Sequence, residues 1–152
     1  MQNAQSPNLA QLYETDYARW LDETIEQLKA REFDALDLSN LIEELADMGC
    51  SQKQALASNL ELLLRHLLKW KYQPTQQTPS WRLTIRERRK QIRRLLRDSS
   101  SLKPELERRL PEEYANAREL AADETGLSLD WFPTQPPFGI EQALDDRFWP
   151  QS

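Results

Sequence analysis

Five arginines recur at spacings of 4, 3, 4 and 4 residues: Arg82, Arg86, Arg89, Arg93 and Arg97. Because residues three and four apart share one face of a helix, this spacing predicts a basic stripe along a helix over residues 81–97. Guanidinium groups are planar and bind carboxylates and phosphates bidentately. The stripe is therefore the candidate interaction surface. Its alternative partners are acidic segments of the chain itself, an acidic protein and a nucleic-acid backbone.

His66 is the only histidine, so any metal-assisted hydrolase or nuclease would be built on it. Such a centre would need carboxylates from elsewhere, and Glu43, Glu44 and Asp47 are the candidates. Glu43 and Asp47 lie four residues apart, opposite the apolar stripe of their predicted helix, which is typical of a solvated acidic face. We therefore interpret His66 as a structural residue that is hydrogen-bonded, for instance to the loop over residues 73–80.

The remaining nucleophiles lack the partners that catalysis needs. Cys50 is the one cysteine, and without a second one it has no redox partner in the chain. No serine stands in a G-x-S-x-G elbow, and neither a P-loop nor a G-x-G-x-x-G motif occurs. We predict no catalytic residue, no cofactor and no metal, which favours a non-enzymatic protein.

The composition is polar, with 39% hydrophobic and 30% charged residues, yet the apolar residues recur at helical spacing. Only three glycines occur, and no run alternates β-branched with polar residues, so the predicted fold class is all-α. The single cysteine and the lack of a signal peptide in residues 1–8 predict a cytoplasmic protein. The absence of a long apolar run predicts no membrane partner.

Charge is segregated along the chain, although the net charge is only −5. Residues 14–61 sum to −8, residues 62–97 to +10 and residues 98–152 to −7. An acidic total does not favour nucleic acid or an anionic membrane, but the local basic excess keeps nucleic acid open as an alternative.

The segment that must position these groups is a leucine-rich helix predicted over Ser51–Tyr72. Most of its circumference is apolar, with the residues Leu56, Leu60, Leu62, Leu63, Leu64, Leu67, Leu68 and Trp70. A helix of this kind has to be covered on several sides. Ser51 and Gln54 resemble a capping box at its start, and Pro74 ends it. Glu61 precedes Arg65 by four residues, the favourable order for an ion pair.

Two predicted helices precede this central helix. The first runs from Thr15 or Asp16 to about Lys29, with Tyr17, Trp20, Leu21, Ile25 and Leu28 on one face. A connector follows, in which Phe33 and Leu36 are expected to pack under the core. The second runs from Asp37 to Met48, with Leu38, Leu41, Ile42, Leu45 and Met48 facing inward. Gly49 is expected to end it, so that it forms an antiparallel hairpin with the central helix.

After the proline-containing loop over residues 73–80, Ser80 is expected to cap the arginine-rich helix. Arg88 falls within the apolar stripe of this helix, so we expect it to have a carboxylate partner or to extend outward to solvent. Trp70 and Trp81 bracket the loop and are interpreted as core residues. A groove for a small ligand or a peptide between them is the alternative.

The last third of the chain predicts two helical pieces and an ordered tail. The pieces cover Leu102–Leu110 and Glu112–Thr125, are kinked or separated at Pro111, and end at Gly126. The tail combines several prolines with the aromatic residues Trp131, Phe132, Phe138, Phe148 and Trp149. We expect it to wrap over the bundle with one short helix near Ile140–Asp146.

Five short motifs occur in order along nearly the whole chain. They are Leu12-Tyr13-Glu14-x-Asp16, His66-Leu67-Leu68-Lys69-Trp70-x-Tyr72, Ser80-Trp81-x-x-Thr84-Ile85, Glu124-Thr125-Gly126-Leu127 and Phe132-Pro133. On these motifs the chain resembles the bacterial domain of unknown function twenty-nine, a family abundant in cyanobacteria, from about Leu12 to Pro150. The resemblance implies a compact all-helical domain and a bacterial source, but no particular activity. It marks His66, Trp70 and Trp81 as family-motif residues.

Together these observations predict a single-domain helical bundle of five to seven helices over residues 9–150, after a flexible N-terminus over residues 1–8. The helices surround the central buried helix, and a Pro/aromatic-rich C-terminal wrap covers them. We expect a non-enzymatic cytoplasmic interaction or regulatory module that acts through charged helical surfaces on a protein partner or on a second copy of itself. Nucleic-acid backbone binding through residues 82–97 is the alternative, and a metal-assisted hydrolase or nuclease is the second alternative.

Overall fold

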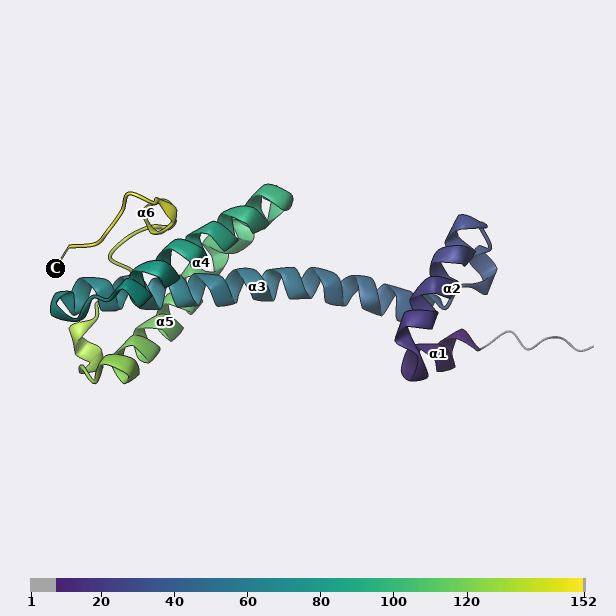
Figure 1. Ribbon diagram of the computed structural model, residues 1–152, viewed down its shortest axis with the longest axis horizontal. Coiled ribbons are helices and arrows are strands. Elements are labelled where there is room, and N and C mark those ends of the chain that lie inside the picture. Colours follow the sequence, from purple (N-terminus) through teal and green to yellow (C-terminus); the bar gives the residue numbers. More distant parts are fainter. Residues whose placement is uncertain (1–7, 152) are drawn as a thin grey trace, which may run out of the picture. The chain divides into compact units, whose positions relative to one another are not determined.

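Every regular element between residues 8 and 151, the part of the chain that the computed structural model describes, is helical (Figure 1). The six α-helices of this part are α1 Leu9–Thr15, α2 Tyr17–Lys29, α3 Leu38–Tyr72, α4 Pro79–Asp98, α5 Lys103–Thr125 and α6 Ile140–Leu144. The predicted all-α class is confirmed. Contacts within the chain gather into two units, residues 1–50 and 51–152. The single domain over residues 9–150 stays a prediction.

Helix α3 is continuous over Leu38–Tyr72, so the predicted hairpin is wrong. Gly49 lies inside the helix, and Ser51 and Gln54 form no capping box. A glycine in a helix interior costs only about 1 kcal/mol relative to alanine, which the backbone hydrogen bonds on both sides of it offset. The left-handed conformation that ends a helix is found instead at Gly126, as predicted, with φ 75°.

The first unit consists of α1, α2, a connector and the start of α3. The predicted flexible N-terminus lies outside the described residues except for Asn8, whose side chain accepts a hydrogen bond from the Ala10 amide and caps α1. Asp16 follows α1 and, as predicted, caps α2 by accepting from the Arg19 amide. Tyr13, Tyr17 and Trp20 pack edge-on or stacked at centroid distances of 4.9–6.0 Å.

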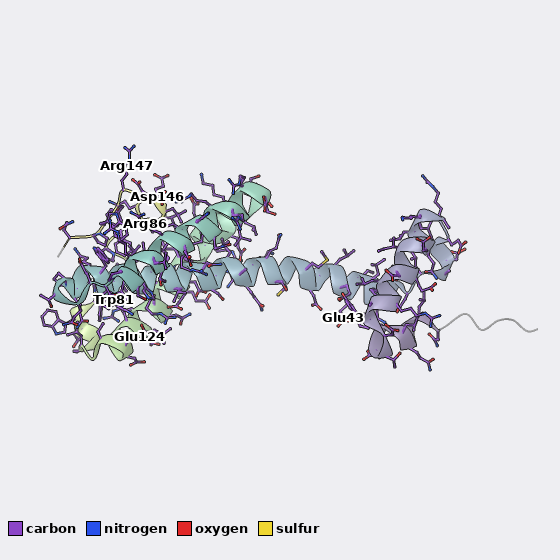
Figure 2. The ribbon with its side chains drawn as sticks, viewed as in Figure 1. Glu43, Trp81, Arg86, Glu124, Asp146 and Arg147 are labelled. Atoms are coloured by element: carbon purple, nitrogen blue, oxygen red, sulfur yellow. The ribbon has the colours of Figure 1, made fainter. Side chains whose placement is uncertain are left out.

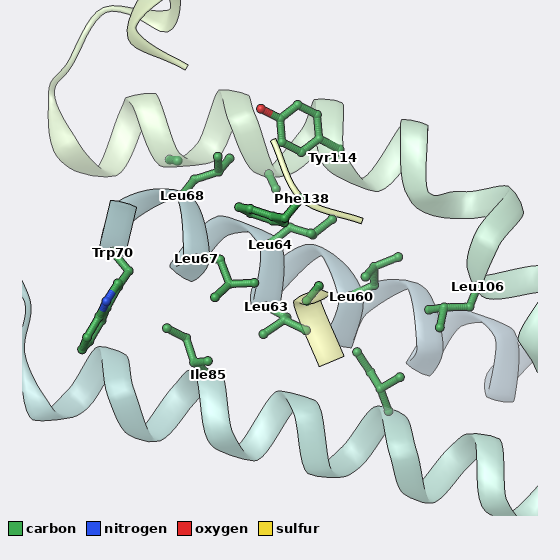
Figure 3. Packing of buried hydrophobic residues seen from close by; sticks show 14 of the residues in the cluster. Leu60, Leu63, Leu64, Leu67, Leu68, Trp70, Ile85, Leu106, Tyr114 and Phe138 are labelled. Carbon is green, nitrogen blue, oxygen red and sulfur yellow. The ribbon is translucent and has the colours of Figure 1, made fainter. Parts of the chain in front are cut away.

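The core of the second unit is built around residues 56–70 of α3, as predicted for the central helix (Figure 3). Six leucines of this stretch are fully buried: Leu56, Leu60, Leu63, Leu64, Leu67 and Leu68. Ile85 and Ile92 of α4 and Leu106 and Tyr114 of α5 pack against them. Each of the two helices covers a different side of α3, which is how a helix that is apolar most of the way round becomes enclosed.

The start of α4 differs from the prediction, and of the two alternatives for α5, kinked or separated at Pro111, the separated one is wrong. Thr78, rather than Ser80, caps α4 by accepting from the Trp81 amide, and Pro79 occupies the first turn, where a missing N–H costs nothing. Helix α5 is continuous, with Pro111 inside it. One lost backbone hydrogen bond does not separate the two halves, because Leu106 and Tyr114 hold them in the same core.

The C-terminal segment is the ordered wrap that the aromatic content predicts. Phe132 and Phe138 are buried, and the short helix α6 lies within the expected range. The Tyr114 hydroxyl donates to the Pro133 carbonyl at 2.6 Å, and the Arg118 guanidinium donates to the Phe132 and Leu129 carbonyls. These bonds attach the segment to α5 before it reaches α4.

Candidate interaction surfaces

Arg89 is the one member of the predicted stripe that is fully buried, so it takes no part in an exposed surface. Its Nε donates to the Ala143 carbonyl and its Nη2 to the Phe148 carbonyl, both at 2.7 Å. The guanidinium lies 5.2 Å from the ring centroid of Trp149. Burial lowers the pKa of Arg89, although an arginine stays protonated at neutral pH. The charge therefore holds the C-terminal segment rather than meeting solvent.

Two further arginines of the stripe contact the same segment. Arg82 lies 4.5 Å from the ring centroid of Trp149, a cation–π distance. Arg93 donates to the Leu144 carbonyl at 2.9 Å and forms a two-pronged ion pair with Asp146 at 3.0 and 3.1 Å. Since helix α6 ends at Leu144, Arg89 and Arg93 satisfy carbonyls that its C-terminus leaves unpaired. The partners of these arginines belong to the tail, not to the acidic helices.

Arg88 does not occupy the middle of the buried stripe. Its side chain is 28% exposed, donates to the Asn59 side-chain oxygen at 2.7 Å and lies 3.7 Å from the Glu87 carboxylate. The expectation that Arg88 has a carboxylate partner or extends outward to solvent is therefore confirmed. On a helix, Arg88 and Arg89 flank the Ile85–Ile92 stripe on opposite sides, about 100° apart. The C-terminal tail packs on the Arg89 side of this stripe. For this reason Arg89 is buried and Arg88 is not.

The outer side of α4 keeps four exposed cations, which we call the basic face: Arg86, Lys90, Arg94 and Arg97. Within residues 8–151, none of the four forms an ion pair with a carboxylate. Arg86 and Arg97 belong to the predicted stripe, whereas Lys90 and Arg94 were missed. A full helical projection would have found them, since both fall within about 80° of Arg86. Figure 2 shows Arg86 and Asp146 on the same side of the second unit.

A charge network connects α3 to α5 where α4 begins. Lys69 and Arg65 both donate to the Glu124 carboxylate, at 2.7 and 2.5 Å, and Arg65 also pairs with Glu61 as predicted. Lys69 lies 4.8 Å from the ring centroid of Trp81. Burial alone would raise the pKa of Glu124, but the bonds from Lys69 and Arg65 outweigh it and hold the pKa below its ordinary value. Trp81 and Glu124 are labelled in Figure 2.

The family-motif histidine is bonded within its own helix rather than to the loop over residues 73–80. His66 Nδ1–H donates to the Leu62 carbonyl at 3.0 Å. Burial lowers the pKa of His66, and the nearby Lys69 lowers it further, so the ring is neutral at neutral pH. Trp70 packs in the core, 4.8 Å from the Trp149 ring. In residues 8–151 no three His, Cys, Asp or Glu side chains gather as a metal site would require.

A match to a known family covers most of the residues described above. The family model described as a domain of unknown function, DUF29, matches residues 12–149. The chain belongs to the DUF29 family. Comparison with curated proteins and with solved structures gave no match. The DUF29 match begins inside α1, so it includes the charge network and the tail of the second unit as well as most of the first unit.

The first unit of this DUF29 chain carries exposed apolar side chains, including residues of α3 that the sequence predicted to face inward. They form two strips, Tyr17, Leu21, Ile25 and Leu28 on α2 and Leu38, Ile42, Leu45 and Met48 on α3. Phe33 of the connector is also exposed, contrary to the expectation that it packs under a core. None of the helices described for residues 8–151 combines the length and hydropathy that a bilayer crossing requires.

Proposed function

We propose that the chain is a non-enzymatic interaction module that binds an acidic segment of a partner protein through the basic face of α4. The observation that supports the proposal is the exposure of four cations, Arg86, Lys90, Arg94 and Arg97, without a carboxylate partner in residues 8–151. The neighbouring arginines Arg82, Arg89 and Arg93 are already bound to the tail. The basic face is therefore what remains available for a partner.

The helix that carries this face is fixed on its other side. Ile85 and Ile92 are buried in the core, and Arg89 is anchored by two carbonyls. The four cations stand at intervals of 4, 4 and 3 residues, so they span roughly 16 Å along the helix axis. An exposed ion pair contributes only about 0.2–1 kcal/mol, and several must form together to hold a partner. Four cations in a row on a fixed helix can form several ion pairs at once with an acidic helix whose carboxylates lie one turn apart.

An acidic protein is favoured over nucleic acid because the whole chain carries a net charge of −5. Acidic segments precede and follow the basic one, and their field opposes the approach of a long polyanion. A short acidic segment can contact the basic face alone. Steering by this face would raise the association rate at low salt.

Fluorescence anisotropy with a labelled glutamate-rich helical peptide of about 20 residues tests the proposal. We expect saturable binding that the triple variant Arg86→Glu/Lys90→Glu/Arg94→Glu abolishes. Arg19→Glu, a charge reversal at an exposed residue of α2, should leave binding unchanged. Labelled single-stranded DNA and RNA of matched charge are titrated in parallel. If the nucleic acids bind more tightly than the peptide, and if each lost cation lowers the salt dependence of their binding by about one unit of slope, the partner is nucleic acid rather than protein. Absence of binding to every probe would overturn the proposal.

A further inference from the structure

The first unit has almost no core of its own. Leu12 and Trp20 are its only buried hydrophobic residues within the described chain, whereas nine large hydrophobic side chains between Tyr17 and Met48 are 37–65% exposed. In the second unit, four such side chains are exposed and the core cluster holds most of the others. A helical segment of this size cannot offset its conformational entropy with two buried side chains. The apolar strips of this unit therefore require a cover.

The strip on α3 has the composition of a helix-packing seam. Its residues Leu38, Leu45 and Met48, together with the half-buried Leu41, follow the alternating spacing of three and four residues that is typical of two helices packed side by side. In helical projection the arc from Met48 through Leu38 to Ala46 spans about 160° and contains no charged residue of the segment 38–50. The carboxylates Glu43, Glu44 and Asp47 all lie outside it.

Hydrogen bonds keep this strip in place. Glu44 accepts from the hydroxyls of Tyr13, at 3.2 Å, and of Tyr17. Trp20 Nε1 donates to the Asp37 carboxylate at 3.2 Å, and Asn40 donates to the same carboxylate at 2.7 Å. Helix α2 is thus fixed to the start of α3 by polar contacts on the side away from the apolar arc. These contacts leave the apolar arc of α3 uncovered.

We propose that a second copy of this chain covers the two strips, forming a two-fold symmetric dimer through residues 17–48. The absence of charge on the α3 arc selects neither a basic nor an acidic partner, whereas an apolar surface is complementary to itself across a two-fold axis. The acidic groups face away from the seam, so pairing two copies does not press their carboxylates together. The dimer is independent of the basic face on α4.

The available area fits a stable dimer. A half-exposed side chain of this size keeps roughly 60 Å² of apolar surface, so the eight strip residues offer roughly 500 Å² per copy. Homodimer interfaces are about 65% apolar, so this corresponds to roughly 800 Å² of total area per copy. That is about the area each partner buries in a stable interface of standard size.

Light scattering coupled to gel filtration on the full chain tests the dimer. The mass should be twice the 17.9 kDa of one chain at micromolar concentration and should fall on dilution. Leu45→Glu should raise the dissociation constant at least 100-fold. Leu83→Glu is the matched control, because Leu83 lies in the second unit and is 58% exposed against 59% for Leu45. It should leave the dissociation constant unchanged.

Circular dichroism separates loss of pairing from loss of folding. Both variants should keep the cooperative unfolding of the second unit. If Leu45→Glu lowers the helix content of the concentrated protein, the milder Ile42→Ser/Met48→Ser variant provides the dissociation constant instead. A chain that is monomeric at every concentration, or a dimer that Leu83→Glu weakens while Leu45→Glu and Ile42→Ser/Met48→Ser do not, would overturn the proposal.

Discussion

Helix α3 belongs to both units, and leucines that are exposed in its first half are buried in its second half. Leu60 and Leu64 are fully buried, while Leu38 and Leu45 are more than half exposed. In the second unit α4, α5 and the tail supply enough apolar surface to enclose the helix. In the first unit only α1, α2 and a connector are present. The comparison shows that helical periodicity defines an apolar face but not what covers it.

The two units also use charge differently. In the second unit the cations of α3 and α4 have specific partners: Lys69 binds Glu124, and Arg89 binds the tail carbonyls. In the first unit Glu44 accepts from two tyrosines, and the other acidic groups near the α3 strip, Glu43 and Asp47, are exposed. In the second unit, polar contacts therefore hold the helices and the tail around the core. In the first unit, polar contacts fix the position of the exposed apolar strip on α3.

The largest effect is expected from a matched pair of leucine truncations on α3. Leu64→Ala removes a fully buried side chain and should lower the free energy of unfolding by about 2–5 kcal/mol. Leu45→Ala should change it by less than about 0.5 kcal/mol in chain diluted below the dimer dissociation constant. Urea denaturation followed by circular dichroism measures both. Equal losses at the two sites would remove the distinction between the halves of α3.

A second pair of variants compares a buried with an exposed arginine of α4. Arg89→Ala leaves the Ala143 and Phe148 carbonyls without donors and should cost about 2–4 kcal/mol, because each unpaired buried group costs about 1–3 kcal/mol. Trp149 fluorescence should shift to the red as the tail leaves α4. Arg86→Ala should do neither. A tail that stays in place in Arg89→Ala would show that the arginine does not anchor it.

Tyr114→Phe should have a smaller effect, about 1 kcal/mol, from the loss of its hydrogen bond to the Pro133 carbonyl. Tyr72→Phe is the control, since the Tyr72 hydroxyl makes no hydrogen bond within the described residues. Burial raises the pKa of Tyr114 to about 12, so its phenol should titrate in ultraviolet absorbance only near that pH. Ionisation of every tyrosine near pH 10 in the folded protein would contradict this packing.

The smallest effect concerns acid pH. The pKa of Glu124 is lower in the folded than in the unfolded chain, so its ion pairs contribute stability above the unfolded pKa of about 4.3. That stability is lost as the pH falls through the folded pKa. Glu124→Gln should flatten this acid limb, while Glu119→Gln, at an exposed position of α5, should not. Urea midpoints between pH 3 and pH 7 measure the difference, and parallel curves for the wild type and Glu124→Gln would exclude the pair.

Much of the second unit could be predicted because strong local patterns agree with the packing. The enclosed leucines of α3, the Gly126 terminus and the ordered tail all follow from spacing and residue type. The choice between Arg88 and Arg89 could not be predicted, because it depends on the side from which the tail approaches α4. A projection of one helix contains no information about a segment that begins 54 residues further along the chain.

The first unit was mispredicted for a related reason. Gly49 followed by a possible capping box at Ser51 is compatible with a helix break or with a continuous helix, and local propensity separates the two by only about 1 kcal/mol. The apolar strip of residues 38–48 was correctly identified as a strip. An inward orientation of this strip follows only if residues of the same chain cover it. In the second unit, the ion pairs of Glu124 with Arg65 and Lys69 were missed because they join two different helices.

Hydrogen–deuterium exchange read by mass spectrometry at two protein concentrations tests most directly whether the two units differ in what completes their cores. Amides of residues 56–68 should be strongly protected at both concentrations, because their cover belongs to the same chain. Amides of residues 40–48 should be protected in the concentrated protein and should exchange faster after dilution. Equal protection of both segments, unchanged by dilution, would contradict the account.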